Sequence, residues 1–212
     1  MEGQVQEAAE GGLVALAPLL TPEQRSAALG PALDSLCGEG CDEELTAGAA
    51  RLLAGLLGAL GPLDPGWCAA CGRGQLLRLA GHSSYAVRQE AVAGVVRLMA
   101  CSPPEEQMDA LMPAFARLCG DAVWSVRHEA AGELAAVAAL LPRGGAADAV
   151  LPLRAALAGD VSQWVRGEAA KQTGPLLAAL HPACPNGEHA RRLGGGWRTG
   201  ECGHESPFML EL

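Results

Sequence analysis

A pair of cysteines in the segment Trp67-Cys-Ala-Ala-Cys71 has the spelling of a dithiol redox motif. Thiol–disulfide exchange of that type needs a thiolate held at the N-terminus of a helix that follows a strand. The residues that come before the motif, 56–66, do not have the pattern of a strand, and the apolar run from Leu52 to Leu63 favours a buried helix. The context of the motif therefore argues against redox chemistry.

Two close pairs of cysteines could instead supply the four thiolates of a zinc site. These residues are Cys37, Cys41, Cys68 and Cys71. However, Cys37 stands between a leucine and a glycine, as does Cys119, which has no cysteine nearby. We therefore interpret Cys37 and Cys119 as small core residues at the ends of helices, and zinc remains an alternative. Four more possible ligands are scattered through a glycine-rich C-terminal segment: Cys184, His189, Cys202 and His204.

A His-Glu pair, His128-Glu129, is a possible pair of iron ligands. Its environment is repetitive, because three segments share one pattern at a constant spacing along the chain: Tyr85–Ala91, Trp124–Ala130 and Gln163–Ala169. The matching positions in the other two segments read Gln89-Glu90 and Gly167-Glu168. Since a di-iron centre needs several converging ligands and histidine is missing twice, the sequence argues against such a centre.

The same three segments align an arginine column with aspartates in the preceding turns. Arg88, Arg127 and Arg166 are equivalent, and Asp121 and Asp160 precede the last two at the same separation. An aspartate in a turn can bond an arginine of its own repeat or of a neighbouring one, which predicts a ladder of charge-assisted hydrogen bonds. His82 stands where the first aspartate is expected, so the ladder should fray there.

Aromatic residues follow the turns at the same places: Tyr85, Trp124 and Trp164. Large aromatic side chains often dominate the energy of protein–protein binding. We therefore treat these three residues as candidate partner contacts. The alternative is that they seal the end of each helix pair.

A fixed period of roughly 40 residues, built from two helices, predicts an all-α fold, an α-solenoid of about four hairpins, right-handed in its stacking. Residues 1–20 are expected to be a lead-in segment, in which Gly11 and Gly12 break the helix. Residues 21–181 should hold the array. Its first pair of helices, about 21–36 and 42–60, is degenerate, and Pro113 and Pro152 should bend two later helices at equivalent points. We expect a disordered, glycine-rich C-terminal tail over 182–212.

Composition limits the classes of function. The chain of 212 residues has a formal net charge of −9, which argues against nucleic-acid binding because phosphate contacts need a basic surface. The apolar run at 52–63 is too short to span a membrane. The acidic N-terminus does not fit a signal peptide, so we expect a cytoplasmic or nuclear protein whose eight cysteines remain mostly thiols.

Two segments resemble a known family of helical-repeat proteins. The span from Leu111 to Arg127 (LMPAFARLCGDAVWSVR) and the span from Gln163 to Leu177 (QWVRGEAAKQTGPLL) are similar to the HEAT repeats of regulatory subunit 1 of serine/threonine protein phosphatase 4. The likeness covers about residues 75–181, whereas the N-terminal repeats and the tail depart from the family, whose array is much longer.

This resemblance implies a non-catalytic regulatory or scaffold subunit that binds a type 2A-like phosphatase catalytic chain. The turns 80–85, 119–124 and 158–164 would make the contacts, with no catalytic residue, metal or cofactor. Two alternatives stay open. One is a HEAT adaptor for another protein. The other is an enzyme similar to the deoxyhypusine hydroxylases, HEAT-like proteins that hold two irons with His-Glu pairs on successive repeats.

Overall fold

The computed structural model describes residues 2–38 and 42–181, and every regular element in these two stretches is helical. This confirms the all-α class. The predicted tail at 182–212 and Cys41 lie outside the described residues. Within the described part of the chain, no helix is long and apolar enough to cross a membrane.

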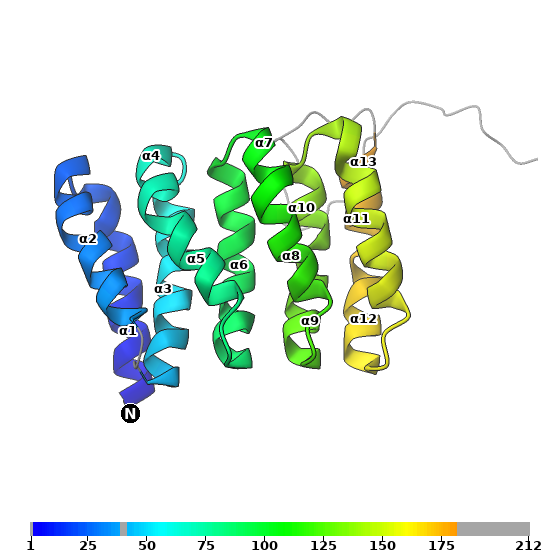
Figure 1. Ribbon diagram of the computed structural model, residues 1–212, viewed down its shortest axis with the longest axis horizontal. Coiled ribbons are helices and arrows are strands. Elements are labelled where there is room, and N and C mark those ends of the chain that lie inside the picture. Colours follow the sequence, from blue (N-terminus) through cyan, green and yellow to red (C-terminus); the bar gives the residue numbers. More distant parts are fainter. Residues whose placement is uncertain (1, 39–41, 182–212) are drawn as a thin grey trace, which may run out of the picture.

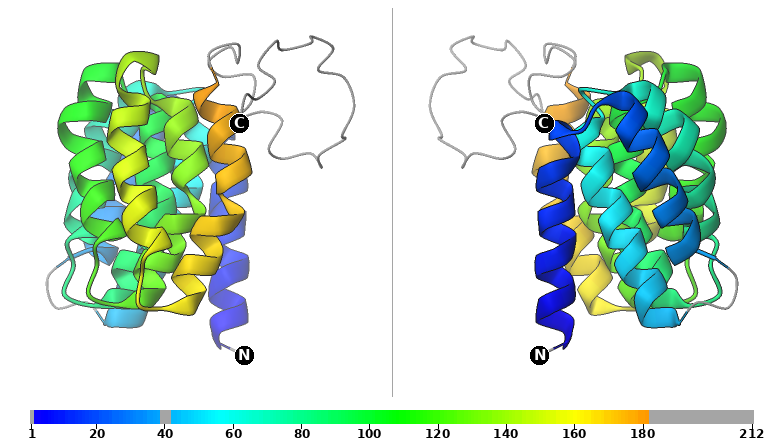
Figure 2. Two further views of the ribbon diagram at one scale, coloured as in Figure 1. Left: turned by 90° about the vertical axis from the view of Figure 1, so that its right-hand side faces the viewer. Right: turned by 90° about the vertical axis from the view of Figure 1, so that its left-hand side faces the viewer.

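The helices form two layers that run side by side along one row (Figures 1 and 2). The first layer holds the opening helix of each hairpin: α2 (Pro22–Leu36), α4–η2–α5 (Pro65–Trp67, Cys68–Gly72, Arg73–Ala80), α7–η3–α8 (Pro104–Glu106, Gln107–Leu111, Met112–Cys119) and α11 (Arg143–Ala158). The second layer holds the returning helices: α3 (Glu43–Leu60), α6 (Tyr85–Cys101), α9–α10 (Trp124–Gly132, Leu134–Leu140) and α12–α13 (Gln163–Lys171, Thr173–Leu180).

The last three hairpins keep the register of the sequence repeat throughout. Their opening helices begin at Pro65, Pro104 and Arg143, and their returning helices begin at Tyr85, Trp124 and Gln163. Each opening helix is followed by a glycine with nearly the same backbone angles, with φ of −106°, −102° and −97° at positions 81, 120 and 159. Because these helices begin at equivalent positions and the turns have similar backbone angles, the residues that follow each turn lie along one edge of the row, the lower edge in Figure 1.

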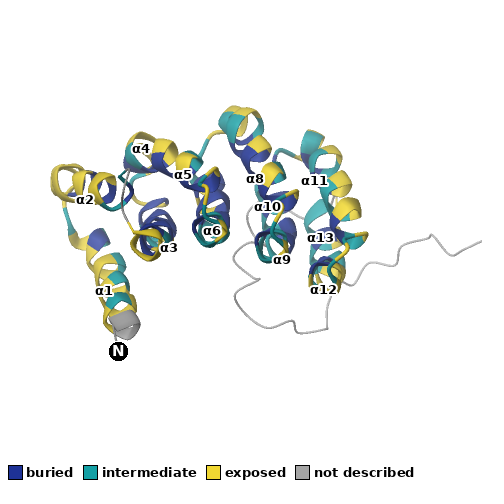
Figure 3. Cartoon of the chain, turned by 60° about the horizontal axis from the view of Figure 1, so that its bottom comes forward, coloured by how far each residue is buried: buried dark blue, intermediate teal, exposed yellow. Residues whose placement is uncertain are grey.

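The apolar core lies between the two layers and continues from hairpin to hairpin (Figure 3). Val87, Val126 and Val165, the valines of the shared pattern, are fully buried, as are Leu76 and Phe115. Removing an aliphatic side chain of this size from water contributes about 1.5–3 kcal/mol. Each hairpin therefore derives much of its stability from its neighbours, and the row holds its residues in fixed relative positions.

The N-terminal segment differs from the prediction, because α1 (Glu2–Leu16) runs without a break through Gly11 and Gly12. A glycine inside a helix costs about 1 kcal/mol relative to alanine, but packing can outweigh that cost. Helix α1 packs against α3, and Val14 contributes to the core. It thus adds another helix to the second layer.

The equivalence predicted for Pro113 and Pro152 is only partial. Pro113 follows a π-helical turn, η3, at the start of α8, whereas Pro152 lies inside the uninterrupted helix α11. The π turn recurs one repeat earlier as η2, where Gly74 occupies the position of the proline. Proline is therefore not what the two π turns share. Helix α2 begins with a complete N-terminal cap, since Thr21 and Gln24 bond each other reciprocally.

Candidate protein-binding surface

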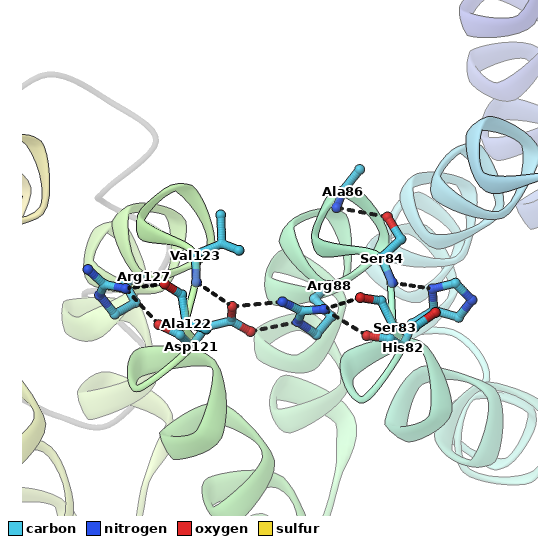
Figure 4. A network of polar contacts seen from close by, with 9 residues as sticks. All are labelled: His82, Ser83, Ser84, Ala86, Arg88, Asp121, Ala122, Val123 and Arg127. Carbon is cyan, nitrogen blue, oxygen red and sulfur yellow. Dashed lines mark hydrogen bonds and ion pairs between the residues drawn. The ribbon is translucent and has the colours of Figure 1, made fainter.

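Two arginine–aspartate clamps connect successive hairpins close to the turns, and Figure 4 shows the first of them, between Arg88 and Asp121. Nε and Nη2 of Arg88 donate to the two carboxylate oxygens of Asp121 over 2.6 and 2.8 Å. Arg127 donates to Asp160 in the same way, over 2.6 and 2.9 Å. In both clamps the partner lies 33 residues further along the chain, so each clamp reaches from one hairpin into the next. Bidentate pairs of this kind are among the strongest charge-assisted hydrogen bonds.

The third nitrogen of each guanidinium fixes the turn of its own hairpin. Nη1 of Arg127 donates to the backbone carbonyls of Asp121 and Ala122 over 2.7 and 3.1 Å. Arg166 makes the same two bonds, to the carbonyls of Asp160 and Val161, over 2.7 and 3.0 Å. Among the described residues, however, Arg166 has no carboxylate partner.

The aspartates are held in their charged form. Oδ1 of Asp160 also accepts the backbone N–H of Ser162 at 2.7 Å. The pKa of Asp160 is lowered, mainly by the hydrogen bond from Arg127, with desolvation opposing. For Asp121 desolvation is the largest single influence and raises the pKa, but the hydrogen bonds from Arg88 and Val123, together with the charges of Arg88 and Arg127, outweigh it and lower the pKa. Both carboxylates therefore favour the folded state when ionised.

The first turn of the series substitutes a histidine for the aspartate. Nδ1 of His82 accepts the backbone N–H of Ser84 at 3.1 Å, the bond that Asp121 and Asp160 make in their own turns. The position that would supply an arginine, one repeat before Arg88, is Ala49, which is buried. His82 thus preserves the hydrogen bond within the turn. No clamp to the preceding hairpin can form here, because His82 replaces the aspartate and Ala49 replaces the arginine.

The three turn aromatics are exposed at the edge that the clamps fix. The exposed fractions are 50% for Tyr85, 47% for Trp124 and 62% for Trp164, so a large part of each residue is open to solvent. Trp124 and Trp164, from neighbouring hairpins, line one open hollow of about 380 Å³ together with Gln89, Ser125 and His128.

The hollow therefore draws its lining from three successive hairpins. The rings of Trp124 and His128 meet edge to face with their centroids 6.3 Å apart. Such an arrangement is favourable for aromatic rings. Sequence reasoning identified the two tryptophans but not Gln89 or His128 as their neighbours, although all four lie in the segments that share the repeated pattern.

A second set of charges follows the returning helices. Arg51 of α3 donates to Glu10 of α1 and to Glu90 of α6, both over 2.9 Å. Glu168 accepts from Lys171 at 2.7 Å and lies 3.7 Å from Nε2 of His128. Sequence reasoning missed Arg51, even though Arg51 and Glu90 lie 39 residues apart. Three of these residues, Glu90, His128 and Glu168, stand at positions that the hydroxylase alternative would use as ligands.

The five cysteines in the described part of the chain are thiols, and Cys37, Cys68 and Cys119 among them are buried. Cys68 lies in the π turn η2 and is paired with Cys101, and this hydrogen bond is the main reason why the pKa of Cys68 is strongly raised. Burial raises the pKa of Cys71. Both shifts oppose the thiolate that redox exchange needs. Within residues 2–38 and 42–181, no cluster of three or more His, Cys, Asp or Glu side chains could hold a metal ion.

Another hollow, of about 510 Å³, lies at the far end of the row among α1, α2 and α3. Its lining is mainly apolar and includes Val5, Leu13, Leu36, Leu45 and Leu52. It does not involve the turn aromatics.

Comparison with known proteins does not assign the chain to a family. No family model matches it, and no curated protein matches it. The candidate surface is therefore defined by its geometry: exposed aromatic side chains, drawn from successive hairpins and held at one edge by buried ionic clamps.

Proposed function

We propose that this chain is a HEAT-like α-solenoid segment and acts as a non-catalytic scaffold that binds another protein along the edge formed by its turns. The observation that carries the proposal is the shared hollow between Trp124 and Trp164. Tryptophan is among the residues enriched at binding hot spots, and here two exposed tryptophans from neighbouring hairpins line the same hollow.

Rigidity supports the same proposal. The clamps from Arg88 to Asp121 and from Arg127 to Asp160 connect the turns that carry the aromatics. A partner would therefore meet side chains whose relative positions are already fixed, and less of the binding energy would be lost in ordering them.

For the partner, we propose the catalytic chain of a type 2A-like serine/threonine phosphatase, that of phosphatase 4. The support is the resemblance of residues 75–181 to the HEAT repeats of its regulatory subunit 1, together with the exposure of the turns expected to make the contacts. The scaffold would steer the choice of substrate while the catalytic chain performs the hydrolysis.

The test is a binding measurement with purified phosphatase 4 catalytic subunit and a Trp124→Ala/Trp164→Ala double variant. Since hot-spot tryptophans cost about 2 kcal/mol or more when truncated, we expect the affinity to fall at least about 30-fold. We expect the melting temperature to stay nearly unchanged because both side chains are largely exposed.

Leu63→Ala is the matched control, since Leu63 is similarly exposed but lies in the turn between α3 and α4. Figure 1 shows that α3 and α4 are joined at the edge of the row opposite the turns that carry the aromatics. It should change neither the affinity nor the melting temperature. Equal affinity of the double variant and the wild type would exclude the tryptophan edge as the binding site. No measurable binding by the wild type would exclude this phosphatase and leave the adaptor for another protein.

A further inference from the structure

The last described hairpin carries one half of a clamp. Nε and Nη2 of Arg88 and of Arg127 donate to an aspartate of the next hairpin, while Nη1 donates to backbone carbonyls in the turn of the same hairpin. Arg166 grips its turn with Nη1 through the same two carbonyl positions. Its guanidinium is thus anchored like the other two, and among the described residues no carboxylate meets the remaining nitrogens.

Apolar side chains on α11 and α13 of the same hairpin are also exposed where their equivalents in the preceding hairpin are buried. Ala138 of α10 is only 3% exposed because it faces α13, whereas Leu177, at the equivalent position of α13, is 63% exposed. Met112 is buried in α8, and its equivalent in α11, Leu151, is exposed. At these positions the face formed by α11, α12 and α13, which we call the terminal face, therefore exposes apolar surface that the preceding hairpin buries.

We infer that the terminal face is a docking site for a further helical hairpin that carries an aspartate in the turn between its two helices. The chemistry of the occupant follows from the two clamps already formed: a carboxylate in that turn would complete the bidentate pair with Arg166, and an apolar helix pair would cover Leu151 and Leu177. Residues 182–212 do not supply that aspartate in register, because Thr199 occupies the position that would follow Arg166 as Asp160 follows Arg127. This inference does not depend on the phosphatase proposal or on the tryptophan edge.

The test supplies such a hairpin in register. A second copy of residues 143–181 is inserted between residues 181 and 182 of the full chain, which places the copied aspartate at the same separation from Arg166 as Asp160 has from Arg127. Hydrogen exchange is then followed by mass spectrometry in α12, α13 and the inserted copy. We expect exchange in α12 and α13 to slow about tenfold or more, as burial of the face and a new clamp would produce.

Two variants of the extended chain assign the effect to the clamp. Arg166→Gln, and separately the aspartate of the copy changed to asparagine, should each remove most of the added protection. The two changes together should remove no more than either one alone, because they break the same pair. Arg117→Gln is the control, since Arg117 is an exposed arginine on α8, and it should leave the protection intact.

Several results would overturn the inference. The first is rapid hydrogen exchange throughout the inserted copy with unchanged exchange in α12 and α13, because a matched hairpin would then not have bound to the terminal face. The second is protection that survives Arg166→Gln. The third concerns the natural chain: removal of residues 182–212 speeds hydrogen exchange in α12 and α13, and Arg166→Gln in the intact chain has the same effect. Residues 182–212 would then be the occupant of the terminal face. The last is self-association of the natural chain that Arg166→Gln abolishes, because the occupant would then be a second copy.

Discussion

A single aspartate in this fold performs three tasks. The carboxylate of Asp121 accepts hydrogen bonds from the guanidinium of Arg88 in the preceding hairpin, and its Oδ1 also accepts the backbone N–H of Val123. The backbone carbonyl of Asp121 accepts a hydrogen bond from Arg127 of the same hairpin. The sequence predicts the two partners from the column of arginines and the turn aspartates. It does not predict which arginine meets the carboxylate, since the short separation between Asp121 and Arg127 fits a bond within one hairpin as well as a bond between hairpins.

Removal of a clamp should destabilise the chain in proportion to its burial. We expect Arg127→Ala to lower the free energy of unfolding by about 1–3 kcal/mol, because it leaves the largely buried Asp160 without its main partner. Arg166→Ala is the matched control, since it removes the same carbonyl contacts without breaking an ion pair, and the loss should be smaller. Urea denaturation followed by circular dichroism measures both values. Equal losses would mean that the carboxylate contact contributes nothing to stability.

At the scale of the elements, the sequence locates α2 and α3 closely, at about 21–36 and 42–60, and the repeated segments mark the starts of α6, α9 and α12. The turn signals recur once in every repeat, and helical propensity agrees with the apolar spacing. Two features of the helices do not follow from the sequence. Helix α1 continues through Gly11-Gly12 because α3 offers it a packing surface, and the π turns η2 and η3 depend on how each opening helix fits onto α6 and its neighbours. Both depend on tertiary contacts that local patterns do not contain.

Close packing between helices predicts opposite effects for two glycines. A methyl group on Gly94 of α6 would lie 2.6 Å from Cδ1 of Leu76, which is fully buried, whereas nothing lies within 4 Å of the equivalent point on Gly167 of α12. We expect Gly94→Ala to destabilise the fold by about 1–2 kcal/mol through overpacking. Gly167→Ala should stabilise it by about 0.5–1 kcal/mol through helix propensity. Thermal and urea unfolding measure both changes, and stabilisation by Gly94→Ala would show that the α5–α6 contact is looser than described.

At the scale of the whole molecule, the clamps make stability depend on pH. The folded-state pKa values of Asp121 and Asp160 lie below the ordinary value of 3.8. Their contribution is therefore fully present above that value and is lost as the pH falls through the lowered folded pKa. Glu133 acts in the opposite sense, because burial raises its pKa, so its ionisation above that pKa disfavours the fold.

Asp160→Asn isolates the contribution of one clamp to this pH dependence. The variant should be less stable than the wild type at pH 7, and the difference between them should shrink as the pH falls from 5 to 2. Asp148→Asn is the control, since Asp148 is exposed on α11, and it should follow the wild-type curve. The measurement is the free energy of urea unfolding at each pH. A difference that stays constant over this range would exclude ionisation of Asp160 as its source.

The reach of each clamp also determines where the chain can be cut. A fragment that ends between two hairpins, at residue 142, would contain Arg127 but not Asp160. The guanidinium of Arg127 in its last helix pair would therefore lack its carboxylate partner. Stopping after residue 162 would retain the carboxylate and its turn, and of the described helices it would remove α12 and α13. Limited proteolysis and domain mapping should therefore yield their most persistent pieces with ends displaced by half a hairpin from the boundaries that the sequence period suggests.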